Sequence, residues 1–304
     1  LQQITIRRLD GHQLQLISFD ESLPLSLKGG EVFITDLTYS QAHGLQPASD
    51  KLRWETSWGE LVYKGLTSRG GEAQGEVSAD SYRLRELKLP LEKSQLQAEG
   101  EWRRDDLGLH QLSLQAKQLD LDKLNALLQP KHELAGNLDL EADIHSQGHD
   151  NQSLLRELGG TLRMGGKELF LDGIRLDAYL DEALKTLPKQ SNFDTLYPHI
   201  EGGDTGINQL ALHIQGEAGK LTLDGSLASI THLLAVRGSL DLTQQQWQSE
   251  LGLLNQQQCA ELTARLTGPL VTPDITFKNP SPCQPWPEVQ VPYPPQGRRG
   301  SLRN

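Results

Sequence analysis

The stretch Leu134-Ala135-Gly136-Asn137-Leu138-Asp139-Leu140-Glu141-Ala142-Asp143-Ile144 decides the fold class. From Leu138 to Ile144, apolar side chains occupy every second position and carboxylates occupy the positions between them. Successive side chains of a β-strand point to opposite faces of the sheet. The stretch therefore predicts a strand with one aliphatic face and one wet face.

The same alternation recurs along most of the chain. Leu210, Leu212 and Ile214 precede a return segment with Leu221 and Leu223, and Gly216 to Lys220 between them predicts a hairpin turn. Further strand pairs are predicted at 95–102 with 107–116, and at 234–242 with 247–253. A slip in the alternation at Gln111 predicts a bulge or bend.

Helical spacing is rarer. Between 176 and 187 apolar residues recur three and four positions apart, and Pro188 ends the run, which predicts an amphipathic helix. Shorter helices are predicted at 121–128 and 152–158. The predicted fold is mainly β, a β-rich α+β chain, with an elongated, curved antiparallel sheet or groove and a few short amphipathic helices.

Composition and charge narrow the classes of function. The 304 residues include 56 leucines against 5 phenylalanines and 1 methionine, so the interior is aliphatic. The formal net charge is -11, which argues against nucleic acid as a partner because phosphate neutralisation needs lysine and arginine. The basic residues Arg298, Arg299 and Arg303 lie in a terminal stretch that we expect to be flexible.

The sequence has no run of 18 apolar residues and no signal peptide. It starts with Leu1 in what resembles the middle of a strand. We therefore expect the chain to be part of a longer protein whose membrane anchor lies outside it.

Two cysteines, Cys259 and Cys283, have 23 residues between them. In an oxidising compartment they can form a disulfide that ties the last strand to the proline-rich tail. The alternative is a pair of unrelated buried thiols.

Sequence signals for catalysis are weak. The nucleotide-binding glycine loops and the Gly-x-Ser-x-Gly elbow are absent. His145 and His149 are four apart but are expected in a turn, which disfavours a metal site. Carboxylate pairs such as Asp120 with Asp122 and Asp177 with Asp181 arise by chance among 40 acidic residues. Asp177 and Asp181 also lie on the polar side of the predicted helix, where solvation explains them, and Cys259 has no activating neighbour. We expect no enzyme, no cofactor and no metal.

An ordered series of segments resembles the C-terminal region of the AsmA family, which is related to TamB-type envelope proteins. The most specific segments are Leu158-Gly159-Gly160-Thr161-Leu162 and Phe170-Leu171-Asp172-Gly173-Ile174-Arg175-Leu176-Asp177. The strand-to-helix step at 118–128 and the ending Leu266-Thr267-Gly268-Pro269 to Ile275 follow the same pattern. Many relatives have a glycine where Arg175 stands.

We expect three regions: a β-rich part at 1–84, which fits only by its β pattern, an AsmA-like region at 85–279 with the helix 176–187, which the resemblance implies, and a tail at 280–304, which its seven prolines indicate to be flexible. The resemblance also implies a Gram-negative periplasmic protein attached to the inner membrane by a missing N-terminal helix. The implied role is in outer-membrane biogenesis and phospholipid transport along an aliphatic β-sheet groove, and the family offers no catalytic residues to carry over.

Two functions remain open on this basis. In the first, the groove shields or transfers phospholipid or another acyl-chain lipid; in the second, the chain is a non-catalytic structural or interaction module of envelope assembly or a secretion apparatus, with envelope β proteins as partners. For each candidate lipid-facing residue, an ordinary core position is the alternative. The candidates are Leu138, Leu140, Ile144, Leu210, Leu212, Ile214, Leu221, Leu223, Leu240 and Leu242.

Overall fold

The chain folds into two compact units, each described here by itself. The computed structural model describes residues 3–18, 24–40, 44–48, 51–128, 132–186, 202–278 and 284–286. Unit 1 contains Leu1–Gln129 and Asp139–Thr161, and unit 2 contains Pro130–Leu138 and Leu162–Asn304. The expected regions 1–84, 85–279 and 280–304 stay predictions.

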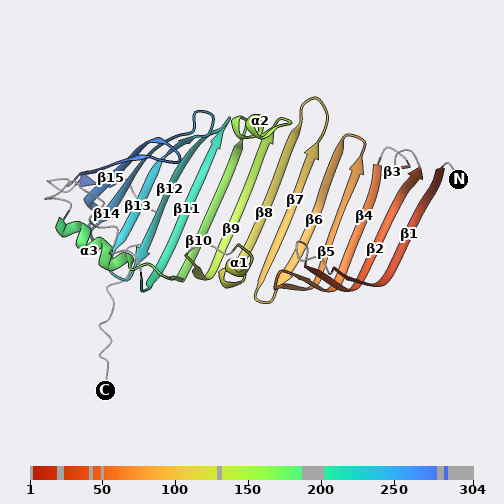
Figure 1. The fold of residues 1–304 in the computed structure, drawn as a ribbon, viewed down its shortest axis with the longest axis horizontal. Coiled ribbons are helices and arrows are strands. Elements are labelled where there is room, and N and C mark those ends of the chain that lie inside the picture. Colours follow the sequence, from red (N-terminus) through yellow and green to blue (C-terminus); the bar gives the residue numbers. More distant parts are fainter. Residues whose placement is uncertain are drawn as a thin grey trace, which may run out of the picture. The chain divides into compact units, whose positions relative to one another are not determined.

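Unit 1 is built from antiparallel strands and two short helices (Figure 1). Its elements are β1 (Gln3–Ile17), β2 (Leu25–Ser40), β3 (Gly44–Pro47), β4 (Lys51–Tyr63), β5 (Leu66–Ser78), β6 (Ser81–Leu91), β7 (Ser94–Arg103), β8 (Leu109–Asp120), α1 (Leu121–Leu128) and α2 (Asn151–Arg156). The strands β9 (Leu134–Gln147) and β10 (Gly159–Leu171) each contribute residues to both units.

Unit 2 repeats this plan with one helix. Its elements are α3 (Leu176–Thr186), β11 (Thr205–Glu217), β12 (Lys220–Ser229), β13 (Leu233–Asp241), β14 (Gln246–Leu254), β15 (Cys259–Pro269), β16 (Asp274–Lys278) and β17 (Gln284–Pro285). The strands from β11 to β16 pair with their sequence neighbours in antiparallel order. The predicted mainly β, antiparallel class with a few short helices is confirmed.

The register of unit 2 gathers leucines on one face. Residues directly opposite each other in paired strands lie on the same face of a sheet. One cross-strand row, from β11 to β15, consists entirely of leucine: Leu210, Leu227, Leu234, Leu253 and Leu262. We call the surface that contains this row the apolar face of unit 2; its next rows contain Leu212, Val236, Leu251, Ala264 and Phe277, and then Ile214, Leu223, Leu266 and Ile275.

The opposite face of unit 2 has a row of alternating charge. Asp224, Arg237, Glu250 and Arg265 are direct cross-strand partners from β12 to β15. The Arg237 guanidinium lies 2.7 Å from the Glu250 carboxylate. Because each charge faces an opposite charge on the next strand, this row favours the same register as the leucine row.

Unit 1 separates its faces in the same way. Ala73, Leu87, Ala98 and Leu114 form a row from β5 to β8. The adjacent row on the opposite face is Glu72, Lys88, Gln97 and Gln115. We call the surface of the first row the apolar face of unit 1. At one end of this face, α1 contributes Leu124 to a cluster around Leu91, Ala116 and Leu119.

The helices match the spacing seen in the sequence. α1 has the predicted bounds, α2 covers 151–156 of the predicted 152–158, and α3 is confirmed up to Thr186, while residue 187 lies outside the described residues. Asp150 caps α2 by accepting hydrogen bonds from the N–H groups of Gln152 and Ser153. These bonds, led by the one from the Ser153 backbone, lower the pKa of Asp150.

The predicted bulge at Gln111 is wrong. β8 begins at Leu109, and it pairs with β7 from His110 to Lys117 without a register shift. Leu107 precedes the strand and is 56% exposed, and Gly108 adopts a positive φ of 54°. The slip in alternation therefore marks the start of the strand rather than an irregularity within it.

The predicted hairpin turn between β11 and β12 is confirmed. Glu217 pairs with Lys220, so Ala218 and Gly219 form a two-residue turn. Their φ angles are 50° and 69°, which is the left-handed conformation of a type I′ turn. Glycine adopts this conformation at little cost, whereas alanine pays for its Cβ.

We predict that Ala218→Asn stabilises unit 2, because asparagine tolerates the left-handed conformation better than alanine does. The expected gain is about 0.5–1 kcal/mol in the free energy of unfolding, measured by urea denaturation. Gly219→Ala is the control and should lower the stability. Equal stability of the parent and Ala218→Asn would contradict the turn geometry.

Tryptophans lie over glycines of neighbouring strands. A Cβ added to Gly75 would lie 2.6 Å from the ring of Trp54, which is its cross-strand partner, and 2.5 Å from the Arg83 carbonyl oxygen. A Cβ on Gly71 would likewise meet the Trp58 ring at 2.2 Å. Because Gly71 and Gly75 have no side chains, the indole rings have room on the apolar face of unit 1.

We predict that Gly75→Ala destabilises unit 1 by about 1–3 kcal/mol through overpacking against the indole. The measurement is urea denaturation followed by tryptophan fluorescence. Gly165→Ala is the matched control, because its Cβ would have its nearest neighbour at an ordinary 3.7 Å. The packing argument fails if both variants unfold at the same urea concentration.

Candidate functional site

The apolar face of unit 2 contains most of the candidate lipid-facing residues. The register brings together Leu210, Leu212, Ile214, Leu221, Leu223 and Leu240 on this one face. Leu242 follows the end of β13, where its N–H donates to the Gly219 carbonyl oxygen at 2.8 Å. Their contact with lipid stays a prediction.

The three other candidates lie on β9 and differ in burial. Leu138, in unit 2, is only 5% exposed. In unit 1, Leu140 packs against the cluster around Leu91, Ala116 and Leu119, while Ile144 is 36% exposed. Leu138 is thus a core position, Leu140 is partly buried against a core cluster, and Ile144 is at the surface.

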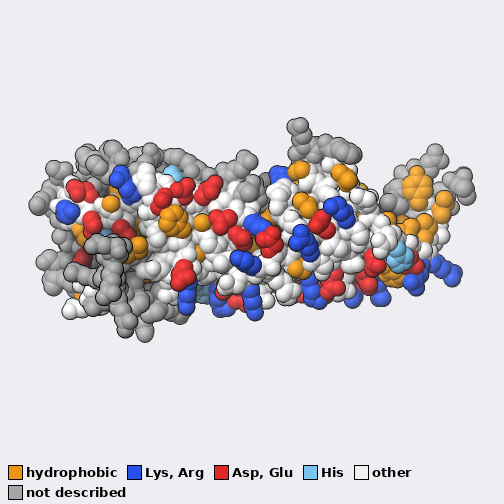
Figure 2. All heavy atoms as spheres, turned by 90° about the horizontal axis from the view of Figure 1, so that it is seen from below, with side chains coloured by type: hydrophobic (Ala, Val, Ile, Leu, Met, Phe, Trp, Pro, Cys, Tyr) orange, Lys and Arg blue, Asp and Glu red, His pale blue; other side chains and the backbone are white. Residues whose placement is uncertain are grey.

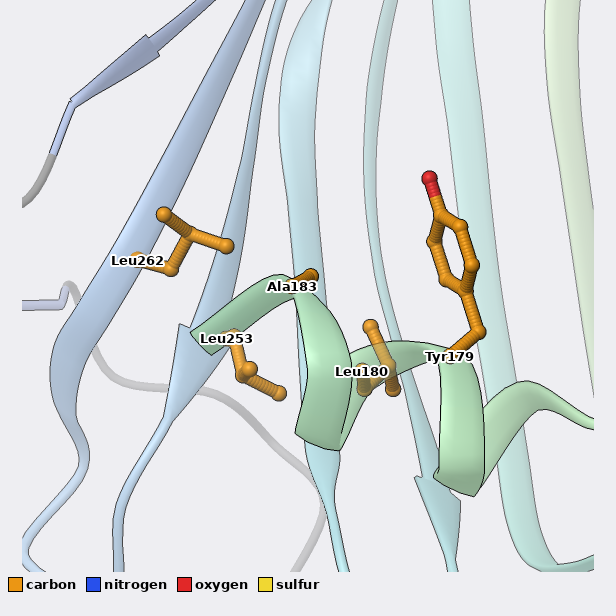
Figure 3. Close-up of a cluster of buried hydrophobic side chains, with 5 residues drawn as sticks. All are labelled: Tyr179, Leu180, Ala183, Leu253 and Leu262. Atoms are coloured by element: carbon orange, nitrogen blue, oxygen red, sulfur yellow. The ribbon is translucent and has the colours of Figure 1, made fainter. Parts of the chain in front are cut away.

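Helix α3 covers part of the apolar face of unit 2. Tyr179, Leu180 and Ala183 of the helix form a buried cluster with Leu253 of β14 and Leu262 of β15 (Figure 3). Leu234 and Phe277, among other apolar residues, pack against this cluster at partial burial. The helix therefore shields Leu234, Leu253 and Leu262 of the all-leucine row, together with Phe277 of the next row.

The apolar face of unit 2 contains both buried and exposed side chains. Leu253 and Leu262 are 3% and 7% exposed, whereas Leu251 in the next row is 36% exposed and Ile275 is 42% exposed. A single face thus changes from closed core to solvent-accessible aliphatic surface. An aliphatic surface of this kind can pack against apolar groups without needing specific polar partners.

A buried histidine joins α3 to the turn between β12 and β13. The Nδ1 of His232 lies 3.1 Å from the Asp177 carboxylate, and its Nε2 lies 3.3 Å from the Asp181 carboxylate. The His232 side chain is only 10% exposed. The interpretation that solvation alone explains Asp177 and Asp181 is therefore wrong. These two residues are four apart on one helix, so they share a face. Both contact a histidine that lies about 50 positions further along the chain.

Ser229 completes this cluster but lacks the geometry of a nucleophile. Its hydroxyl donates a hydrogen bond to Asp177 and accepts one from the His232 backbone N–H at 3.0 Å. The residue has 0% exposure. A serine nucleophile needs a histidine ring nitrogen as base and access to substrate. Ser229 has its hydroxyl committed elsewhere and no access, so its role is structural.

The opposite faces of both units have paired charges. The view in Figure 2 shows acidic and basic side chains interspersed on the described surface. In unit 1, Glu76 of β5 is buried and lies 3.3 Å from Arg53 and 3.8 Å from Lys51, with Arg85 as its third partner. Hydrogen bonds from lysines, Lys28 to Glu60 and Lys88 to Glu86, lower the pKa of both carboxyls. These charge rows are suited to water, whereas on the same face of unit 2 a separate cluster of apolar side chains is buried: Ala228, Leu233, Ala235, Leu254 and Ala260.

Part of the predicted tail packs on the charged face of unit 2. Gln284 and Pro285 form β17 against Cys259 and Ala260. The Trp286 ring stacks under the Arg237 guanidinium at 4.6 Å and lies over Gly252. This stretch is therefore bound to the sheet, whereas the rest of the tail and Cys283 lie outside the described residues. The pairing of Cys259 with Cys283 stays a prediction.

Among the residues that the structure describes, no group of three or more histidine, cysteine, aspartate or glutamate side chains could hold a metal ion. His145 is in β9 and His149 lies in the turn after it, so the pair does not share a helix face. In the same part of the chain, no helix is long and apolar enough to cross a membrane.

The comparison with known families decides the identity. Residues 55–226 match the model of the AsmA family. The chain belongs to the AsmA family. The matched region begins before residue 85 and ends before residue 279, the two ends of the expected region. It includes β5, β6 and α3. No curated protein and no solved structure matches the chain, and the expected relation to TamB-type proteins stays a prediction.

Membership in the AsmA family places the chain among envelope-related proteins associated with outer-membrane biogenesis. The family is generally non-enzymatic.

We predict that Ser229→Ala lowers the free energy of unfolding of unit 2 by about 1–2 kcal/mol, because Asp177 and the His232 N–H lose a buried partner. The measurement is thermal or urea unfolding. Ser226→Ala is the control, since the Ser226 hydroxyl is buried and has no hydrogen-bond partner among the described residues; its stability should stay within about 0.5 kcal/mol of the parent. An equal effect of both variants would contradict the assigned role.

Proposed function

We propose that this AsmA-family chain shields the acyl chains of phospholipid on its apolar sheet faces during traffic through the periplasm. The observation that supports the proposal is the continuity of the apolar face of unit 2, which runs from the covered leucine row to the exposed Leu251 and Ile275. A sheet face that has exposed aliphatic side chains beside buried ones offers an aliphatic surface outside its own core.

The energetics favour an acyl chain as the ligand. Each methylene removed from water contributes about 0.8 kcal/mol and needs no directional partner. Leucine, isoleucine and valine side chains provide such contacts over several rows, whereas a polar ligand would leave its hydrogen-bonding groups unsatisfied there. The headgroup would stay in water beside the face, so one surface can accept lipids with different headgroups.

Periplasmic location and attachment to the inner membrane are part of this proposal. A protein that shields acyl chains is useful where lipid must pass through water between two membranes. The envelope association of the AsmA family supports this setting.

A second candidate function is a non-catalytic interaction module of envelope assembly. It is favoured by exposed apolar side chains at one end of β1, where Leu16 and Ile17 are 52% and 48% exposed. An exposed apolar strand is a surface on which another β protein can pack or pair. In this case the apolar side chains would contact protein rather than lipid.

We predict that Leu251→Asp in unit 2 and Ile144→Asp in unit 1 each reduce binding of a fluorescent fatty-acid probe at least about tenfold. A carboxylate placed against an acyl chain costs more than the 1.4 kcal/mol that corresponds to this factor. Both positions are partly exposed, so the fold should tolerate the change. Native mass spectrometry with lipid extraction of the purified protein provides the second measurement.

Matched controls place the same charge on the opposite faces. Gln248 on β14 and Gln111 on β8 are exposed positions next to the tested rows. The variants Gln248→Asp and Gln111→Asp should both bind the probe as the parent does. A folded parent protein that carries no lipid and does not bind the probe would overturn the proposal. Recovery of a stoichiometric envelope protein would then favour the interaction module.

A further inference from the structure

Helix α3 is a short cover over one end of the apolar face of unit 2. It has 11 residues, and Tyr179, Leu180 and Ala183 are its buried residues. At its start, the N–H of Leu176 donates to the Thr205 hydroxyl at 2.7 Å. A helix of this length is marginal on its own, so its position depends on its contacts with the sheet.

The polar contact of α3 with the sheet is centred on His232. Both ring nitrogens face carboxylates of the helix, Nδ1 toward Asp177 at 3.1 Å and Nε2 toward Asp181 at 3.3 Å. A neutral imidazole has one N–H and one lone pair, whereas the imidazolium has two N–H groups. Only the protonated ring can therefore donate to both carboxylates at once.

We propose that His232 is a proton-controlled clasp that holds α3 on the apolar face and releases it when the ring loses its proton. In the neutral ring the Thr231 hydroxyl, 2.8 Å from Nδ1, can donate to the Nδ1 lone pair, but the attraction between the charged ring and the two carboxylates is lost. Release of α3 would expose Leu253 and Leu262 and so enlarge the surface for acyl chains. This last step rests on the proposed function, whereas the clasp itself does not.

The other groups at the clasp do not reverse the direction in which pH changes the docking of α3. From the β12–β13 turn, the hydroxyls of Ser229 and Thr231 lie at Asp177 and at the His232 Nδ1, and neither is charged. Burial raises the pKa of Tyr179 to about 12, so this phenol stays neutral while histidine titrates. Among the described residues, Asp177 and Asp181 are the charged groups recorded against the ring. Docking is thus tighter while the ring carries its proton.

The test is hydrogen exchange of the α3 amides in the whole chain, from about pH 5.5 to 8.5, the range in which histidines change charge. Rates are corrected for their intrinsic pH dependence, and the amides of β13 provide the internal reference. For the parent protein we expect the opening equilibrium of α3 to rise about tenfold over this range, the size of one charge-assisted hydrogen bond.

Asp181→Asn is the decisive variant, because its side chain is 61% exposed and an amide can donate to a neutral Nε2. In this variant the opening of α3 should vary less than about threefold over the same range. His232→Gln should show no pH dependence. His213→Gln is the matched control, since His213 pairs with Asp224 on the opposite face and its loss should leave the pH dependence of α3 unchanged.

A parent protein whose α3 exchange does not depend on pH would overturn the clasp, and so would an Asp181→Asn variant that keeps the full dependence. Binding of the fatty-acid probe is measured in the same samples. If α3 opens at high pH but the probe does not bind at any pH, the clasp stands and the lipid function fails. If the probe binds equally at every pH while α3 stays closed throughout, the lipid function stands and the clasp fails.

Discussion

The alternation of side chains across paired strands is the constraint on which the rest of the structure depends. In unit 2 the leucine row from Leu210 to Leu262 and the charge row from Asp224 to Arg265 lie on opposite faces of the same strands. A slip of one residue in any pair would move a charged side chain to the aliphatic face and a leucine to the wet one. Packing and electrostatics therefore favour one register, and every surface described above follows from it.

Much of this architecture could be read from local sequence. Period-two alternation, the Ala218-Gly219 turn and the helical spacing after Leu176 each involve residues close together in the chain. Their physical causes, namely the pleat, the left-handed turn and the 3.6-residue repeat, act over the same short range. The prediction failed at Gln111 because alternation cannot tell whether an apolar residue such as Leu107 belongs to the strand or to the turn before it.

The candidate site depends on register and packing between distant segments, and these were not evident in the sequence. Asp177 and Asp181 appeared to be solvated because helical spacing shows which side chains share a face but does not show what that face contacts. The partner, His232, comes from the turn after β12, and Ser229 of the same turn has its hydroxyl bonded to Asp177. A buried histidine beside a serine in the sequence could have suggested a polar cluster, but only the tertiary structure assigns its partners.

The distinction between core and ligand surface is made row by row, because one sheet face contains both. Where α3 covers Leu253 and Leu262, the helix already provides the gain from burying these side chains, so a ligand would have to displace it. At Leu251 and Ile275 the apolar area remains in contact with water, and a ligand gains the full benefit of covering it. The boundary between these rows is the place where a change in the docking of α3 changes the area offered to an acyl chain. Under the proposed function, the covering helix, rather than the composition of the strands, therefore determines how much of the aliphatic face is accessible to an acyl chain.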